Sequence, residues 1–418
     1  MNGVDERSAQ RRRLLAGAAG AGTLAALASH PALGAPLGST GALGFAEIPD
    51  GALSEQQLER LPGKRPLIKK TYRPPNFETP IECFRSAITP NDAFFVRWHL
   101  AGIPMVGAKD WRLVLGGDSL QTPRSYTLDD LRKDFAQVEI TAVCQCSGNR
   151  RGLFVPHVAG VEWGVGAMGN AVWRGVRLKD LLNRSGLKPG AVEIAFNGAD
   201  TAPMEKTPDF VKSLPVEVAL DENTLIAFEM NGRPLPPLNG FPARLVVPGW
   251  TGTYWVKAVV SIDAVSTPES NFWMKTAYRL PRGRYPGYAF KSQQAETTEP
   301  ITTMVTNSLI TSVAFGQQVP HGKPLVVKGL AWDGGSGIDR VEVSSDGGDS
   351  WQRATLGRDL GRFSFREFEH AVPTRATGAM VVMARATSRS GQTQTDTLSH
   401  NPAGYHHNVI QRLFVQVV

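Results

Sequence analysis

The chain has very few cysteines, three in 418 residues. Cys144 and Cys146 lie two residues apart and Cys83 stands alone, so the disulfide framework typical of small secreted domains is excluded. Charged residues make up only 20% of the chain and hydrophobic residues 42%. This balance describes an ordinary globular protein, and the length predicts two or three domains.

Several functional signatures are also missing. The chain has no phosphate-binding Gly-Lys-Ser/Thr loop, no Cys-x-x-Cys-His haem site and no His-Glu-x-x-His zinc helix. The net charge is +7, but basic residues are interleaved with acidic ones, so no basic stripe for nucleic acid is evident. We therefore expect no haem in this chain and no nucleic-acid partner.

The N-terminus has the pattern of an export signal. Arginines at positions 11–13 precede an Ala/Gly/Leu-rich run over residues 14–29, and small residues follow at 31–35. Paired arginines before a mildly apolar run indicate the twin-arginine pathway, which carries folded proteins. We predict that residues 1–35 are this signal and that the protein is periplasmic. The run is too short and too rich in Gly and Ala to act as a membrane anchor.

The mature chain reads as an α+β, β-rich protein, because 43 glycines and 29 prolines indicate many turns. Residues 36–90 read as an irregular arm. Short helices are expected from a cap at Thr127 and a stop at Gly186, and Asn231-Gly232 indicates a hairpin turn. From about residue 291, short strands at 326–327, 340–343, 363–365, 381–384 and 413–415 predict an antiparallel β-sandwich.

The stretch around Cys146 carries the clearest chemistry. Residues 137–143 alternate and are β-branched, which predicts a strand that brings Cys144 and Cys146 to one face. A turn at 147–149 follows, and then Arg150 and Arg151. A thiolate at a strand end beside fixed cations can bind a soft metal next to an anion. The alternative is a buried cysteine pair in a core strand.

Two further segments indicate an anion site. Residues 94–100 read as a hydrophobic strand on which Arg97 and His99 share a face, and such a polar pair needs a partner. The Gly-rich loop at 248–253 precedes an expected strand carrying Lys257. Glycines let backbone N–H groups approach an anion, although such a loop alone is a weak signal.

Taken in order from about residue 66 to 418, these segments resemble the sulfite oxidase family of molybdenum enzymes. The matching segments are Phe94–His99, Cys146–Arg151, Gly166–Val176, Phe228–Leu235, Gly240–Gly249 and Arg340–Trp351. The resemblance implies a sulfite-oxidase-type molybdopterin domain over residues 36–290. An immunoglobulin-like β-sandwich of the dimerisation type would follow over residues 291–418.

The resemblance also implies a set of site residues. Cys146 would bind molybdenum beside the dithiolene sulfurs of molybdopterin. Arg97, Arg151, Trp163 and Tyr278 would be catalytic and surround the oxyanion. His99, Asp200, Asn239, Arg244 and Lys257 would hold the pterin or its phosphate. Two departures stand out: Asn239 replaces a frequent histidine, and the turn at 332–338 lacks an arginine found in the animal enzymes.

The implied activity is oxidation of sulfite to sulfate, closest to the bacterial periplasmic sulfite dehydrogenases. Electrons would pass to a small c-type cytochrome, in a heterodimer with it or from a homodimer; direct oxygen reduction, as in plant members, is the other route. Alternatives are the molybdenum subunit of a sulfur dehydrogenase in thiosulfate oxidation and, less favoured, a sulfoxide reductase. An exported β-sandwich binding protein without metal is the non-enzyme alternative.

Overall fold

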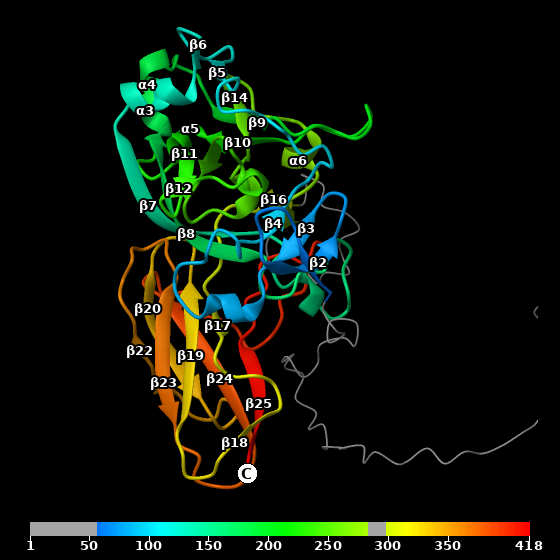
Figure 1. Cartoon of the computed structure of the whole chain (residues 1–418), viewed down its shortest axis with the longest axis vertical. Helices are drawn as coiled ribbons and strands as arrows, with labels where there is room; N and C mark the ends of the chain where they lie inside the picture. Colours follow the sequence, from blue (N-terminus) through cyan, green and yellow to red (C-terminus); the bar gives the residue numbers. More distant parts are fainter. Residues whose placement is uncertain (1–56, 283–297) are drawn as a thin grey trace, which may run out of the picture. The chain divides into compact units, whose positions relative to one another are not determined.

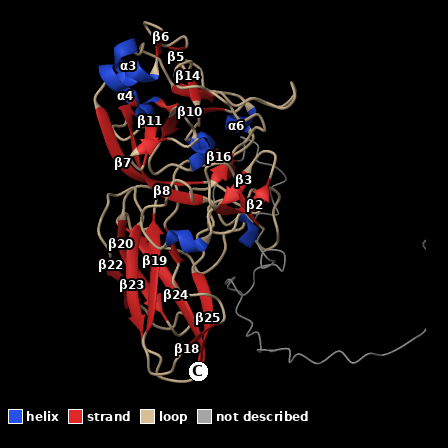
Figure 2. Cartoon of the chain, in the orientation of Figure 1, coloured by secondary structure: helices blue, strands red, loops and turns tan. Residues whose placement is uncertain are grey.

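A computed structural model describes residues 57–282 and 298–418 (Figure 1). The predicted export signal, the first part of the predicted arm (residues 36–56) and the predicted domain boundary after residue 290 lie outside these ranges and stay predictions. No helix within the two described ranges is long and apolar enough to cross a membrane. Strands dominate both ranges and helices are short (Figure 2), which confirms the β-rich fold class.

The first described segment is a small sheet rather than an irregular arm, so that prediction was wrong from residue 58 onward. Its order is β1-β2-β3-β4, with bounds β1 (Leu58–Arg60), β2 (Pro66–Thr71), β3 (Asn76–Glu78) and β4 (Val96–Arg97). The expected strand at 94–100 is reduced to its two central residues. Trp98 and Leu100 are nevertheless buried, because tertiary packing covers them without ladder bonds.

Two five-stranded sheets form the centre of residues 113–265. One has the order β10-β9-β14-β5-β6, from Val211–Pro215, Glu193–Gly198, Val259–Val265, Leu113–Gly116 and Arg124–Tyr126. The other has the order β12-β11-β8-β7 with β13 beside β11, from Arg233–Pro234, Leu225–Met230, Met168–Arg177, Gln137–Gln145 and Arg244–Val246. One apolar core, including Trp173 and Trp255, joins them.

Short helices connect these strands. They are η2 (Ile81–Phe84), α3 (Leu128–Asp134), η3 (Arg151–Leu153), α4 (Leu178–Ser185), α5 (Val216–Ala219), η4 (Pro237–Asn239), η5 (Gly252–Tyr254) and α6 (Phe272–Lys275). Thr127 and Asp130 form the expected capping box of α3, and α4 ends at Gly186 with φ +73°. Asn231 and Gly232 both have positive φ, which confirms the hairpin turn.

Residues 307–417 form the predicted sandwich. One sheet has the order β17-β19-β23-β22, from Asn307–Ile310, Leu325–Trp332, Arg366–Val372 and Thr355–Leu356. The other has the order β18-β25-β24-β20-β21, from Gln317–Val319, Gln411–Val417, Gly378–Ser388, Ile338–Ser344 and Gln352–Arg353. Alternating residues of both sheets bury a common core. A hairpin of β15 (Arg279–Pro281) and β16 (Thr298–Pro300) precedes the sandwich.

The expected strand at 363–365 was wrong. Ser364 N–H donates to Gly361 O at 3.0 Å, so this segment is a turn, and the strand begins at Arg366. The Phe363 carbonyl accepts from Val143 N–H instead of from a strand of the sandwich. Residues 363–365 therefore contact β7 and do not pair with a strand of the sandwich.

Buried polar bonds also join the segment after β7 to the sandwich. The guanidinium of Arg150, which is almost fully buried, donates to Ser308 O at 2.7 Å and to Val409 O at 3.3 Å. Trp332 Nε1 donates to Gln145 Oε1 at 2.7 Å. The end of β7 is therefore fixed from the C-terminal part of the chain.

Candidate functional site

A cavity with about 440 Å³ of empty space, part of it open to solvent, lies where the ends of β4 and β7 meet the segments around η4 and η5. Seven residues that the sequence singled out line it: Arg97, His99, Cys146, Asn239, Arg244, Lys257 and Tyr278. Segments far apart in the sequence thus converge on one site.

Cys144 in β7 and Cys146 directly after it both line the cavity, as expected for residues on one face of a strand. Cys144 Sγ accepts from Arg244 Nη2 at 3.8 Å, and burial raises the pKa of Cys144 although Arg244 opposes this. Cys146 Sγ has no hydrogen-bond partner among the described residues. Its carbonyl accepts from Asn149 N–H at 2.9 Å, which closes the predicted turn. Cys146 is therefore the thiol left free to bind a ligand.

Arg97, His99 and Tyr278 form a connected group on the cavity wall. Arg97 Nη2 donates to the Tyr278 hydroxyl at 3.3 Å, and His99 Nε2 hydrogen-bonds the same hydroxyl. The His99 ring stacks on Phe210 with 3.6 Å between centroids. Burial, with the charges of Arg97, Lys257 and Lys212, lowers the pKa of His99 well below its usual value. His99 is therefore a neutral imidazole at pH 7.

Lys257 and Arg244 supply positive charge to the cavity. Burial lowers the pKa of Lys257 to about 8, although Asp200 raises it. Lys257 lies over the Trp98 ring at 4.8 Å and makes no hydrogen bond or ion pair with another described residue. It precedes β14 by two residues instead of lying in a strand, a small departure from the prediction. An unpaired buried amine favours an anionic ligand.

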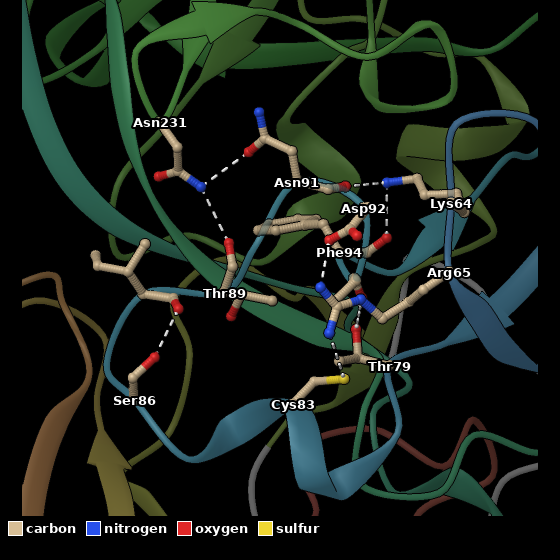
Figure 3. Close-up of polar contacts among 12 residues, drawn as sticks. Lys64, Arg65, Thr79, Cys83, Ser86, Thr89, Asn91, Asp92, Phe94 and Asn231 are labelled. Carbon is tan, nitrogen blue, oxygen red and sulfur yellow. Dashed lines mark hydrogen bonds and ion pairs between the residues drawn. The ribbon is translucent and has the colours of Figure 1, made fainter.

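Asn239 lines the cavity, but its amide is held by the protein. Its Oδ1 accepts from Lys64 Nζ at 2.5 Å and its Nδ2 donates to Phe95 O at 3.0 Å. Lys64 also donates to the carbonyls of Asn91 and Phe94, as Figure 3 shows. Burial lowers the pKa of Lys64 to about 7, and Asp92 opposes this. Asn239 therefore fixes the cavity wall through Lys64.

Three predicted site residues do not line the cavity. Arg151 Nε donates to Ala403 O at 2.9 Å, and its guanidinium lies 4.9 Å from the centroid of Tyr405. Tyr405 in turn stacks on Tyr278 with 5.7 Å between centroids, so Arg151 lies one layer behind the wall. Trp163 is fully buried, and Asp200 is buried where its charge acts on Lys257. Their predicted roles stay predictions.

Sequence reasoning missed several residues that contact the cavity wall: Lys64, Phe210, Lys212 and Tyr405. Lys64 belongs to a Gly-Lys-Arg run that looks like an ordinary surface turn. Tyr405 had one available signal, because His400, His406 and His407 surround it within eight residues. Phe210 and Lys212 carry no local pattern, since only their three-dimensional contacts place them here.

The residues present fit a phosphate-bearing cofactor that brings its own metal. Buried polar atoms without a partner in the described part of the chain include His99 Nδ1, Arg97 Nε and Thr253 Oγ1. Buried polar groups are normally paired, so these atoms suit a polar ligand. Within residues 57–282 and 298–418 no three His, Cys, Asp or Glu side chains cluster as a metal site. A metal bound by Cys146 would therefore need further ligands from the cofactor.

Comparisons with known proteins agree with this site. Residues 99–273 match the family model of an oxidoreductase molybdopterin binding domain, and residues 298–418 match a Mo-co oxidoreductase dimerisation domain. Mitochondrial sulfite oxidase of Rattus norvegicus is 34% identical over 378 residues, covering 85% of this chain and 67% of that protein. Sulfite oxidase of Arabidopsis thaliana is 32% identical over 329 residues, covering 75% and 81%.

A solved structure is similar over nearly the whole chain. The sulfane dehydrogenase SoxCD from Paracoccus pantotrophus has a TM-score of 0.71 and 26% identity, covering 93% of each chain. The structural likeness extends through both the cavity region and the sandwich. The chain belongs to the sulfite oxidase family of molybdenum oxidoreductases and binds a molybdenum–molybdopterin cofactor.

Proposed function

We propose that the protein oxidises sulfite to sulfate in the periplasm and passes the electrons to a small c-type cytochrome. The observation that carries the proposal is the convergence of Cys146, Arg97 and Tyr278 on one cationic cavity. The sulfite oxidases among its relatives support the substrate. The N-terminal export pattern supports the periplasm.

The chain's own residues bind and orient the substrate. Arg97 stays charged at any working pH and can hold a sulfite oxygen beside the metal. The Tyr278 hydroxyl, held by Arg97 and neutral His99, can donate to an oxygen of substrate or product. The molybdenum cofactor supplies the oxygen-atom transfer and accepts two electrons. Overall, sulfite and water give sulfate, two protons and two electrons.

The direct test is turnover by protein matured in a host that makes molybdopterin. We expect bound molybdenum and oxidation of free sulfite with cytochrome c as acceptor. The variant Arg97→Gln should raise KM for sulfite by about 30-fold, because losing a charged hydrogen bond to an anion costs roughly 2 kcal/mol. The exposed Arg112 lies away from the cavity, so Arg112→Gln is the matched control.

Two results would overturn this function. Protein without molybdenum, or loaded protein that does not oxidise sulfite, removes the enzyme proposal. If the purified protein reduced oxygen as fast as cytochrome c, the acceptor would be wrong.

The dimerisation-domain match supports a homodimer, and a heterodimer with the cytochrome is the alternative; light scattering of the isolated chain separates them.

A second candidate is the molybdenum subunit of a sulfur dehydrogenase. The structural likeness to a sulfane dehydrogenase over 93% of the chain favours it. The turn at 332–338 agrees, since Asp333 accepts from Ser336 N–H and Gly337 N–H and supplies no cation for sulfite. Activity on carrier-bound sulfane sulfur without activity on free sulfite would select this candidate.

A further inference from the structure

Lys212 of β10 is a buried lysine without a carboxylate partner. It is 1% exposed, and its Nζ donates to Trp273 O at 2.7 Å. No ion pair within the described residues includes it. The carboxylate of Glu193 already accepts from Ser213 Oγ at 2.6 Å and from Glu269 N–H at 2.9 Å. Burying an unpaired amine is unfavourable, so other contacts must compensate.

Those contacts are aromatic faces. Lys212 Nζ lies 4.4 Å from the centroid of Tyr254 and 5.4 Å from that of Tyr278. Both tyrosines are buried, at 2% and 6% exposure. An ammonium within about 6 Å of an aromatic centroid is attracted to the ring, and more strongly where water is excluded. Lys212 does not line the cavity itself, but it contacts Tyr278, which does.

The segment that carries Tyr278 needs external support. The helix α6 has a single turn and no buried residue, and Tyr278 follows it by three residues. Tyr278 has φ +59°, in the left-handed region that a tyrosine rarely adopts. Lys212 touches this segment twice, at the carbonyl of Trp273 within the helix and at the ring of Tyr278 beyond it.

We propose that Lys212 is a positioning residue for Tyr278. Its ammonium group fastens α6 to β10 and holds the tyrosine ring so that the hydroxyl meets Arg97 and His99 at the cavity wall. The inference rests on the proposed function, because it assigns Lys212 to the placement of a group that acts on sulfite.

The charge of Lys212 depends on pH near neutrality. Burial lowers its pKa to about 7, Arg279 lowers it further and Glu193 opposes them. Above this pH the amine is neutral and its attraction to the ring is lost. The titratable groups on elements next to β10 are Glu193 on β9, Glu217 on α5, Lys275 on α6 and Tyr254 on η5, and the charge of Arg279 on β15 also acts on Lys212. Burial raises the pKa of Tyr254, so that ring stays neutral.

The first test is the pH profile of kcat for sulfite with cytochrome c. Wild-type kcat should fall as pH rises through about 7. Lys212→Met should lose this inflection and lower kcat by about tenfold, the effect of losing one buried cation–π contact, with a smaller change in KM. Lys212→Arg keeps its charge and should keep a high, flat profile. Lys179, which pairs with Glu222 away from the cavity, is the matched control as Lys179→Met.

The second test needs no cofactor. In ¹³C NMR of the unloaded protein, the Lys212 side-chain resonance, assigned by its loss in Lys212→Met or Lys212→Arg, should titrate near pH 7. In Tyr278→Leu its pKa should fall further, because the attractive ring is gone. An unchanged Lys212 pKa in Tyr278→Leu, or a retained kcat inflection in Lys212→Met, would overturn the inference. If wild-type protein fails to oxidise sulfite, the proposed function falls, while the NMR result still decides whether Lys212 and Tyr278 are coupled.

Discussion

At the scale of single residues, the cavity separates two cysteines that the sequence presents as a pair. Cys144 is packed: its sulfur accepts from Arg244, and a Cβ added at Gly252 would lie 3.2 Å from it. Cys146 has a free sulfur on the same cavity. The protein environment therefore leaves the thiol of Cys146 available, as its predicted role as metal ligand requires, and uses Cys144 to complete the wall.

Cys146→Ala should remove activity and bound molybdenum, because the metal loses its protein ligand. We expect a loss above about 100-fold, beyond the 10–100-fold typical of groups that only support a ligand. Cys144→Ala should keep most of both, since Arg244 retains hydrogen bonds to Asn239 O and Trp255 O. Metal analysis and sulfite turnover of the two variants check this. The reverse pattern would show that Cys144 is the ligand.

At the scale of elements, the helix α3 is stabilised by a capping box at its N-terminus. Thr127 Oγ1 accepts from Asp130 N–H at 3.0 Å, and Asp130 Oδ2 accepts from Thr127 N–H at 2.7 Å. Neither Thr127 nor Asp130 lines the cavity. A substitution in this cap should therefore change the free energy of unfolding and leave the activity unchanged.

Thr127→Ala should lower the free energy of unfolding by about 1 kcal/mol, the usual cost of losing an N-cap side chain. Sulfite turnover should not change. Urea denaturation measures the first and steady-state kinetics the second. Asp129→Asn is the control, since Asp129 lies in the same turn but outside the capping box. Equal stability of Thr127→Ala and wild type would contradict the importance of this cap.

The sequence predicted well those strands and helices whose formation depends on neighbouring residues. The alternation before Cys144 predicted β7, and the caps of α3 and α4 depend on residues within one turn. The segments at 94–100 and 363–365 failed for a different reason. Their apolar side chains are buried by contacts distant in sequence, such as Trp98 Nε1 donating to Leu238 O. The periodicity of apolar residues and their strand propensity carry no information about contacts between segments distant in sequence.

The same distinction holds for the site. Arg97, His99 and Cys146 were predictable because charged or soft groups stand out in apolar strands. Lys64 and Lys212 were not, since each reaches its partner across the fold: Lys64 bonds Asn239 from 175 positions away. The contacts of the Arg151 guanidinium with Ala403 and Tyr405 were not predictable either, because both partners lie more than 250 positions away.

At the scale of the whole molecule, buried histidines near the C-terminus make the fold sensitive to acid. Burial lowers the pKa of His406 to about 4 and that of His407, beside Arg150, to about 3. Unfolding returns both to about 6.5, so the unfolded chain binds more protons below that pH. The stability that they contribute is complete above about pH 6.5 and is lost as pH falls towards 4 and 3.

Between pH 6.5 and about 4, His406 alone should cost about 3 kcal/mol of folding free energy, at about 1.4 kcal/mol per pH unit. His406→Gln should therefore lose less stability on acidification than the wild type. Thermal melting across this range checks the difference. His370, which bonds Gln352 at the surface, gives the control His370→Gln. Parallel acid sensitivity of His406→Gln and wild type would show that other groups govern the acid transition.

The two arginines after Cys146 have a consequence for when the metal centre can form. Their guanidinium groups donate to carbonyls of Ser308, Ala403 and Val409. Synthesis must therefore have passed Val409 before the loop after Cys146, the predicted metal ligand, has all of these partners. Cofactor insertion accordingly belongs after this part of the chain has been made, and a chain cut before Val409 lacks one carbonyl partner of Arg150.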